Sequence, residues 1–218
     1  MIKISASTNP CDEKELVNYV KQLQKLGVDY LHCDVMDGEF VENKCLSFET
    51  LKEVYDNTLL PLDVHLMVAD PITQLKKFLT LKPLYITLHY ESFKNEDDII
   101  YAINLLRENK TLVGLSINPE TSVEKILPFI TYIDLVLIMG VHPGKSGQKM
   151  ISNTPRKVKQ LRSIIYDHNY DLKIEVDGGL NKENYQKIVT QGCDILVLGS
   201  ALYKETKKHE LIKEIHKL

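Results

Sequence analysis

The stretch that decides the fold is Leu31-His32-Cys33-Asp34-Val35-Met36-Asp37-Gly38-Glu39-Phe40-Val41-Glu42-Asn43. It continues a largely apolar or β-branched run that begins at Val28, and Asp37-Gly38 is a strong turn dipeptide, so a strand is expected to end there. Because side chains alternate between the two faces of a strand, His32, Asp34 and Met36 share one face, about 6–7 Å apart in succession. An imidazole, a carboxylate and a thioether in this position are either satisfied polar groups at a strand end or parts of a site.

The composition excludes several classes of protein. The chain has 218 residues, of which 44% are hydrophobic and 26% charged, ordinary values for a soluble protein that buries a sizeable core. A net charge of -3 gives no reason to expect nucleic acid or an anionic membrane as a partner. The four cysteines form no CxxC pair, which favours reduced thiols over disulfides. With no signal-peptide pattern and no apolar run near the ~18 residues of a membrane span, the sequence predicts a cytoplasmic protein.

Strand and helix patterns alternate eight times along the chain, at a spacing of roughly 20 to 30 residues. Eight such units in a chain of this length match a (β/α)8 TIM barrel, and a doubly wound open sheet is the main alternative. No linker or low-complexity segment divides the chain, so residues 1–218 are expected to form a single α/β domain. The expected strands are 2–7, 28–36, 61–68, 84–90, 111–117, 133–139, 172–176 and 195–198. Helices are expected between them, including one from 119 to about 130, and the tail to residue 218 is also expected to be helical.

Functional groups of such a barrel gather where the strands end and the following loops begin. Those ends supply two imidazoles and two carboxylates from three different strands: His32, Asp34, His65 and Asp177. These donors suit one divalent metal ion, which could be Zn²⁺, Fe²⁺, Mn²⁺ or Co²⁺. Two turns after the last two strands, Gly178-Gly179 and Gly199-Ser200, offer backbone N–H groups to an anion, as phosphate sites in barrels do. A metal ion beside a phosphate site implies a small phosphorylated substrate with a carbonyl or hydroxyl for the metal.

Two aspartates beside a metal-bound carbonyl suggest proton abstraction next to that carbonyl, with the metal withdrawing charge from the enediolate oxygen that forms. Asp34 could remove the proton from one face while Asp177 returns one to the other. Exchange on opposite faces inverts a stereocentre, so the predicted reaction is an epimerisation without a redox cofactor. Because the metal tends to keep both carboxylates ionised, coupling must leave a proton on one of them, and the residues do not determine which.

Five segments of the chain carry motifs in an order that resembles one known family. They are His32 to Asn43, Leu62 to Met67, Met139 to Gln148, Val176 to Gly179, and Gly199 to Ala201. Together they resemble the ribulose-phosphate 3-epimerase family over nearly the whole chain. The resemblance implies interconversion of D-ribulose 5-phosphate and D-xylulose 5-phosphate at C3, with Asp34 and Asp177 as the acid–base pair. It also implies the four metal ligands already named and a homo-oligomer.

The resemblance further implies a set of substrate-binding residues. Ser7 and His65 would contact the substrate. Three methionines would cap the enediolate: Met36, Met67 and Met139. These methionines would be equally ordinary as apolar residues of the core. Contacts around the phosphate end would come from Gly144, Lys145, Ser146, Gly147, Gly178, Gly179, Gly199 and Ser200. The family usually has Pro in place of Glu42, Phe-Gly in place of Lys145-Ser146 and Phe in place of Met150, and Gly140 and His142 are unusual in their loop. We expect these departures to affect substrate choice and loop closure more than chemistry, and Lys145 could add a charge near the phosphate.

Other interpretations compete with this one. Gly140-Val-His-Pro-Gly-Lys-Ser resembles a P-loop, but it has three residues between its glycines instead of four. On the same fold, the chain could be a D-allulose 6-phosphate 3-epimerase or a non-catalytic phosphosugar-binding barrel. His89, in a His-x-Glu pair with Glu91, is predicted to be hydrogen-bonded scaffold. Asp63 and Glu175 share the inward faces of their strands with His65 and Asp177, so they either support the metal ligands or fill the barrel.

Overall fold

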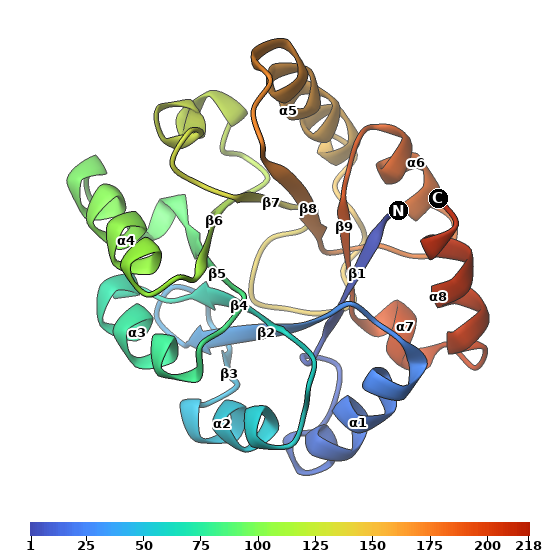
Figure 1. The fold of residues 1–218 in the computed structure, drawn as a ribbon. Coiled ribbons are helices and arrows are strands. Elements are labelled where there is room, and N and C mark those ends of the chain that lie inside the picture. Colours follow the sequence, from blue (N-terminus) through green and yellow to red (C-terminus); the bar gives the residue numbers. More distant parts are fainter.

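Eight parallel strands close into a barrel in the computed structural model, which describes residues 1–218 (Figure 1). The strands are β1 (Lys3–Ser7), β2 (Tyr30–Asp37), β4 (Leu62–Met67), β5 (Tyr85–His89), β6 (Leu112–Ile117), β7 (Leu135–Met139), β8 (Lys173–Asp177) and β9 (Ile195–Leu198). Each pairs with the next in parallel, and the pairing of β1 with both β2 and β9 closes the ring. The predicted (β/α)8 barrel is therefore confirmed, and the open sheet, which would leave two free edges, is excluded.

The helices surround the barrel (Figure 1). They are α1 (Leu16–Leu26), α2 (Phe48–Asp56), α3 (Pro71–Phe78), α4 (Glu96–Glu108), α5 (Thr154–His168), α6 (Tyr185–Thr190), α7 (Ser200–Lys204) and α8 (Lys208–His216). Local signals set their ends: Gly27 ends α1 with φ 83°, and the Asp70 carboxylate accepts the N–H of Thr73 at the start of α3. None of these helices combines the length and the apolar character that crossing a membrane requires.

The structure differs from the sequence prediction in three short elements. The segment expected to be an α-helix from 119 to about 130 contains a 3-10 helix, η4 (Val123–Phe129), with Pro128 inside it, and proline has no N–H for an α-helical bond. A strand that was not predicted, β3 (Lys44–Cys45), pairs antiparallel with the end of β2. The C-terminal tail is broken into α7 and α8 by the extended backbone of Glu205. Shorter 3-10 turns are η1 (Glu13–Glu15), η2 (Leu79–Leu81) and η3 (Tyr90–Ser92).

The alternation of side chains along the strands separates an outer apolar core from a polar interior. Outward-facing residues, Cys33 and Val35 among them, belong to a cluster of 54 buried residues between the barrel and the helices. Inside, an apolar group at the amino ends of the strands fills the bottom of the barrel: Tyr85, Leu135 and Ile195. Above it lie buried polar residues: Ser5, Asp63, Thr87 and Glu175. The apolar faces hold the helices in place, and polar chemistry is confined to the barrel axis and its carboxyl end.

Candidate active site

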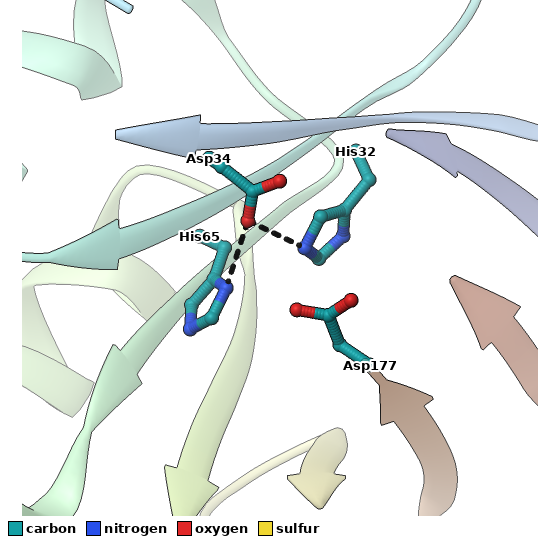
Figure 2. Close-up of side chains that lie close together, drawn as sticks. All are labelled: His32, Asp34, His65 and Asp177. Atoms are coloured by element: carbon teal, nitrogen blue, oxygen red, sulfur yellow. Dashed lines mark hydrogen bonds and ion pairs between the residues drawn. The ribbon is translucent and has the colours of Figure 1, made fainter. Parts of the chain in front are cut away.

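Strands β2 and β4 bring three of the four predicted metal ligands side by side. The two strands pair in parallel with Asp34 opposite His65, and His32 lies two residues earlier on the same face as Asp34. Both imidazoles are completely buried. The Oδ1 atom of Asp34 lies 3.3 Å from His32 Nε2 and 3.3 Å from His65 Nδ1 (Figure 2). The three side chains therefore converge at the carboxyl end of the barrel.

Asp177 approaches this point from the far side. It ends β8, which stands three strands away from β2 around the ring, and its carboxylate faces the other three side chains (Figure 2). One ligand atom from each of His32, Asp34, His65 and Asp177 lies within 4.8 Å of all the others. The structure thus brings together the complete predicted ligand set, with the two aspartates on different flanks.

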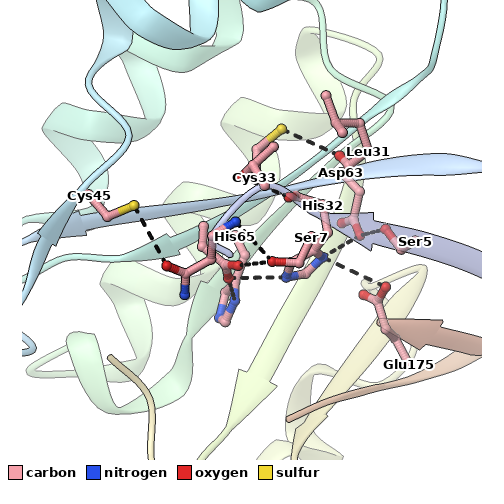
Figure 3. Close-up of polar contacts among 12 residues, drawn as sticks. Ser5, Ser7, Leu31, His32, Cys33, Cys45, Asp63, His65 and Glu175 are labelled. Atoms are coloured by element: carbon pink, nitrogen blue, oxygen red, sulfur yellow. Dashed lines mark hydrogen bonds and ion pairs between the residues drawn. The ribbon is translucent and has the colours of Figure 1, made fainter. Parts of the chain in front are cut away.

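A second group of polar side chains lies beside Nδ1 of His32 (Figure 3). Asp63 Oδ2 accepts a hydrogen bond from Ser5 Oγ at 2.6 Å and lies 2.7 Å from His32 Nδ1. A carboxylate only accepts hydrogen bonds, so this nitrogen of His32 carries the proton. Glu175 Oε1 is 3.9 Å from the same nitrogen, and neither oxygen of Glu175 has a hydrogen-bond partner. Asp63 therefore contacts the predicted ligand His32 directly, whereas Glu175 makes a longer contact.

The charge balance of the site favours a cation. Two imidazoles face four buried or largely buried carboxylates, those of Asp34, Asp63, Glu175 and Asp177. The close partners of these carboxylates include no lysine or arginine. Buried charges of one sign are costly unless they are paired or bound to a metal. The Nε2 atom of His32, buried and aimed at Asp34, also has no hydrogen-bond partner. The residues present therefore fit a divalent cation.

The carboxylates differ in how firmly they hold a proton. Burial raises the pKa of Asp34, but His32 and His65 outweigh it and hold that pKa far below its usual range. Burial, reinforced by the charge of Asp34, raises the pKa of Asp177 to about 7. Burial and Asp63 raise the pKa of Glu175 well above its usual value. The two aspartates of the site are thus electrostatically unequal, although both face the same cluster.

A cavity of about 280 Å³ opens above these side chains. Nearly all of the predicted catalytic and substrate-binding residues line it: Ser7, Asp34, Met36, Met67, Met139, Gly144, Lys145, Ser146, Gly147, Asp177, Gly178, Gly179, Gly199 and Ser200. His32 and His65 lie below the lining and are completely buried. The cavity is large enough for a small phosphorylated sugar.

The turn after β8 depends on glycine. Gly178 has φ 103° and Gly179 has φ 70°, conformations that residues with a side chain rarely adopt. A Cβ atom at Gly178 would lie 2.3 Å from Val141 Cγ2, and one at Gly179 would lie 2.3 Å from the Met150 backbone nitrogen. Glycine therefore lets this backbone pass between its neighbours and form one wall of the cavity.

Two loops meet across the mouth of the cavity. Asn43 donates a hydrogen bond from Nδ2 to the Gly144 carbonyl at 2.6 Å, and Lys145 Nζ lies 3.2 Å from Glu42 Oε2. Glu42 and Lys145 both depart from the residues expected of the family, and the structure pairs them with each other. The loop between β7 and α5 is thereby tied to the loop that follows β2.

The sequence analysis missed several residues of the site. Asn9, Asn181 and Lys204 also line the cavity. The first two follow strand ends, so the rule that found the ligands could have found them, and Lys204 lies one helical turn after Ser200. His89, predicted to be scaffold, lies buried against the predicted ligand His65 with ring centroids 4.9 Å apart.

The chain is similar to known proteins over nearly its whole length. Residues 3–203 match the sequence profile of the ribulose-phosphate 3 epimerase family. The ribulose-phosphate 3-epimerase of Bacillus subtilis is 36% identical over 216 residues, which cover 99% of this chain and 98% of that protein. The enzyme of the same name from Methanocaldococcus jannaschii is 37% identical over 215 residues, which cover 99% and 90%. Among solved structures, KGPDC from Streptococcus mutans matches with a TM-score of 0.75 at 9% identity, and the match covers 100% of this chain and 96% of that one. This is a likeness of fold alone.

Proposed function

Because the chain belongs to the ribulose-phosphate 3-epimerase family, we propose that it interconverts D-ribulose 5-phosphate and D-xylulose 5-phosphate by proton transfer at C3. Family membership makes the protein an enzyme of the isomerase class and supports a pentose phosphate as its substrate. The proposal takes residues 1–218 as one catalytic domain. The observation that carries it is the pair of carboxylates, Asp34 and Asp177, which reach one cluster from β2 and β8.

A carboxylate on each side of the sugar carbon completes an inversion in two proton transfers. One aspartate removes the C3 proton from one face and leaves an enediolate, and the other donates a proton to the opposite face. In the reverse direction the two residues exchange roles. Ser7 supports this arrangement, because its hydroxyl donates to Asp34 Oδ2 at 2.9 Å and holds the carboxylate in its orientation.

One divalent metal ion would be held by His32, Asp34, His65 and Asp177. The mutual distances of their ligand atoms, the excess of buried carboxylates and the unpartnered Nε2 of His32 support this assignment. Such an ion, when bound, would polarise the substrate carbonyl and offset the negative charge that develops on the enediolate. Two imidazoles and two carboxylates suit Zn²⁺, Fe²⁺, Mn²⁺ or Co²⁺.

The rest of the cavity provides an apolar cap and an anion-binding end. Three buried methionines would cover the enediolate and exclude water from it: Met36, Met67 and Met139. The phosphate group would lie against backbone N–H groups of the two glycine turns and of the loop between β7 and α5, at Gly144, Lys145, Ser146, Gly147, Gly178, Gly179, Gly199 and Ser200. His65 would act below the lining, as a metal ligand beneath the substrate.

The proposal also covers location and assembly. All four cysteines are free, which fits a protein of the reducing cytoplasm. A homo-oligomer is proposed from the family resemblance, and light scattering of the purified protein would measure it.

Parallel assays with D-ribulose 5-phosphate, D-xylulose 5-phosphate and D-allulose 6-phosphate test the proposed activity. We expect the pentulose phosphates to be the better substrates by kcat/KM, whereas a preference for the hexulose phosphate would support the D-allulose 6-phosphate 3-epimerase instead. Tight binding without exchange of the C3 proton with D2O would identify a phosphosugar-binding barrel. Asp34→Asn and Asp177→Asn should each lower kcat by about 10²–10⁴-fold, while Asp167→Asn, on the exposed surface of α5, should not.

A further inference from the structure

A chain of hydrogen bonds runs from His65 away from the cavity. His65 Nε2 lies 2.8 Å from His89 Nε2, and His89 Nδ1 lies 3.3 Å from Glu91 Oε2. Both rings are completely buried. The other oxygen of Glu91, Oε1, accepts the N–H of Asn118 at 2.8 Å and the hydroxyl of Thr121. At the other end of the chain, His65 Nδ1 lies 3.3 Å from Asp34 Oδ1, so a carboxylate stands at each end.

Two neutral imidazoles carry one N–H each, so the chain holds two protons for three contacts. Burial disfavours a charged ring and therefore a third proton. The two protons point either toward Glu91, from His89 Nδ1 and His65 Nε2, or toward Asp34, from His65 Nδ1 and His89 Nε2. In the arrangement directed at Glu91, His65 Nδ1 is left with a lone pair.

That lone pair lies 3.3 Å from Asp34 Oδ1, inside the cluster of four proposed metal ligands. Two acceptors at this distance do not bond to each other, but both can bind one cation. We propose that Glu91, acting through His89, is a positioning residue that fixes the tautomer of His65 so that its Nδ1 atom is available to a divalent cation. Asp63 acts on His32 in the same way through one direct bond, so the two histidines present different nitrogens, Nε2 from His32 and Nδ1 from His65.

The inference rests on the proposed function for the presence of the cation, and the tautomer of His65 can be measured without the cation. The proposed positioning role differs from a purely structural role of His89 and Glu91. Scaffold residues would need only to fill space and satisfy hydrogen bonds, and either tautomer of His65 would serve. A positioning role requires one tautomer.

The variant Glu91→Gln separates these roles. The donors of Asn118 and Thr121 would hold the amide oxygen at the position of Oε1, so the amide NH2 would face His89 Nδ1. A donor at that position reverses each bond in the chain, making His89 Nε2 the donor and moving the proton of His65 to Nδ1. The matched control is Thr121→Val, which removes one bond to Glu91 and leaves the carboxylate facing His89.

Long-range ¹H–¹⁵N spectra of the imidazole rings in the full chain, stripped of metal, report the tautomers directly. We expect the Nε2–H form of His65 in the wild type and in Thr121→Val, and the Nδ1–H form in Glu91→Gln. Zn²⁺ affinity, measured by competition with a chelator, should fall by about 10–100-fold in Glu91→Gln, as for other residues that orient a metal ligand. Thr121→Val should keep the affinity of the wild type.

An Nδ1–H form of His65 in the wild type, or an unchanged tautomer in Glu91→Gln, would overturn the inference. A reversed tautomer with unchanged Zn²⁺ affinity would overturn the positioning role. If the wild type has the Nε2–H form but binds no Zn²⁺, the proposed metal site is wrong and the tautomer assignment stands. The spectra and the affinities therefore distinguish failure of this inference from failure of the proposed function.

Discussion

Asp37 connects the two loops that follow strands β2 and β4, which carry three of the proposed metal ligands. Its Oδ1 atom accepts the N–H groups of Glu39 at 2.8 Å and Phe40 at 2.9 Å, and its Oδ2 atom accepts the N–H of Ala69 at 2.6 Å. Burial raises the pKa of this carboxyl, but the backbone donors outweigh burial and hold the pKa below 3.8. The ionised side chain therefore stabilises the loops beside the active site.

The variant Asp37→Asn should lower the free energy of unfolding near neutral pH. The amide oxygen can keep the bonds to Glu39 and Phe40, but the amide NH2 then faces the N–H of Ala69, donor against donor. A lost hydrogen bond to a charged group is worth about 1.5–3 kcal/mol. Because the side chain is partly exposed and water screens it, we expect about 2 kcal/mol, or a Tm lower by about 4–8 °C in a chain of this size.

The pH dependence of this difference tests its electrostatic origin. A folded-state pKa held below the unfolded value gives stability that is present above pH 3.8 and is lost as the pH falls through the folded-state pKa. Urea unfolding followed by circular dichroism should therefore show the full difference between wild type and Asp37→Asn at neutral pH and a smaller one at acid pH, below the usual pKa of an aspartate. Glu39→Gln, on the exposed turn, serves as the control. An equal difference at both pH values would refute the reasoning.

Three further predictions concern the cavity and the metal. Gly179→Ala should lower the free energy of unfolding by about 2 kcal/mol or more, and lower the Tm with it. The reason is that the added Cβ would lie 2.3 Å from the Met150 nitrogen and that the residue has φ 70°. An unchanged Tm in a thermal melt would contradict this prediction. Lys145→Ala should raise KM for a pentulose phosphate by about threefold at low salt and less at high salt, because its charge lies on the cavity lining. An unchanged KM at low salt would show that Lys145 does not act on the phosphate, and Glu42→Gln, which frees Lys145 from its ion pair, should not raise KM. Removal of metal by a chelator should lower kcat by about 100-fold or more. Addition of Zn²⁺, Fe²⁺, Mn²⁺ or Co²⁺ should restore the activity. Full activity in protein shown to be metal-free would count against the metal site.

The parts of the site that follow from strand geometry could be predicted from the sequence. The two-residue period of a strand places His32 and Asp34 on one face, and parallel strands bring their carboxyl ends to one edge. Those two regularities were enough to predict that His65 and Asp177 lie near this point, because in a closed barrel the carboxyl ends of all the strands surround one mouth. The same two-residue period places Cys33 on the outer face of β2, where it belongs to the apolar cluster between the barrel and the helices.

Contacts between loops and between neighbouring strands could not be predicted in the same way. Glu42 and Lys145 are 103 residues apart, and no local pattern records that their loops meet. The stacking of His89 on His65 depends on the register between β4 and β5, in which His65 pairs with Thr87, and a single sequence does not fix that register. The two residues of β3 are too few to show an alternation, whereas Pro128 was a visible signal against the α-helix expected around it.

The fate of the hydrogen at C3 tests the central claim, that two carboxylates act on opposite faces of the sugar. Conversion of D-ribulose 5-phosphate to D-xylulose 5-phosphate would be run in D2O and stopped at low conversion, and the product would be analysed by NMR and mass spectrometry. Because the group that removes the proton is not the group that returns one, the product should carry deuterium at C3 from the first turnover. Product that retains the original C3 hydrogen of the substrate would contradict the two-carboxylate mechanism.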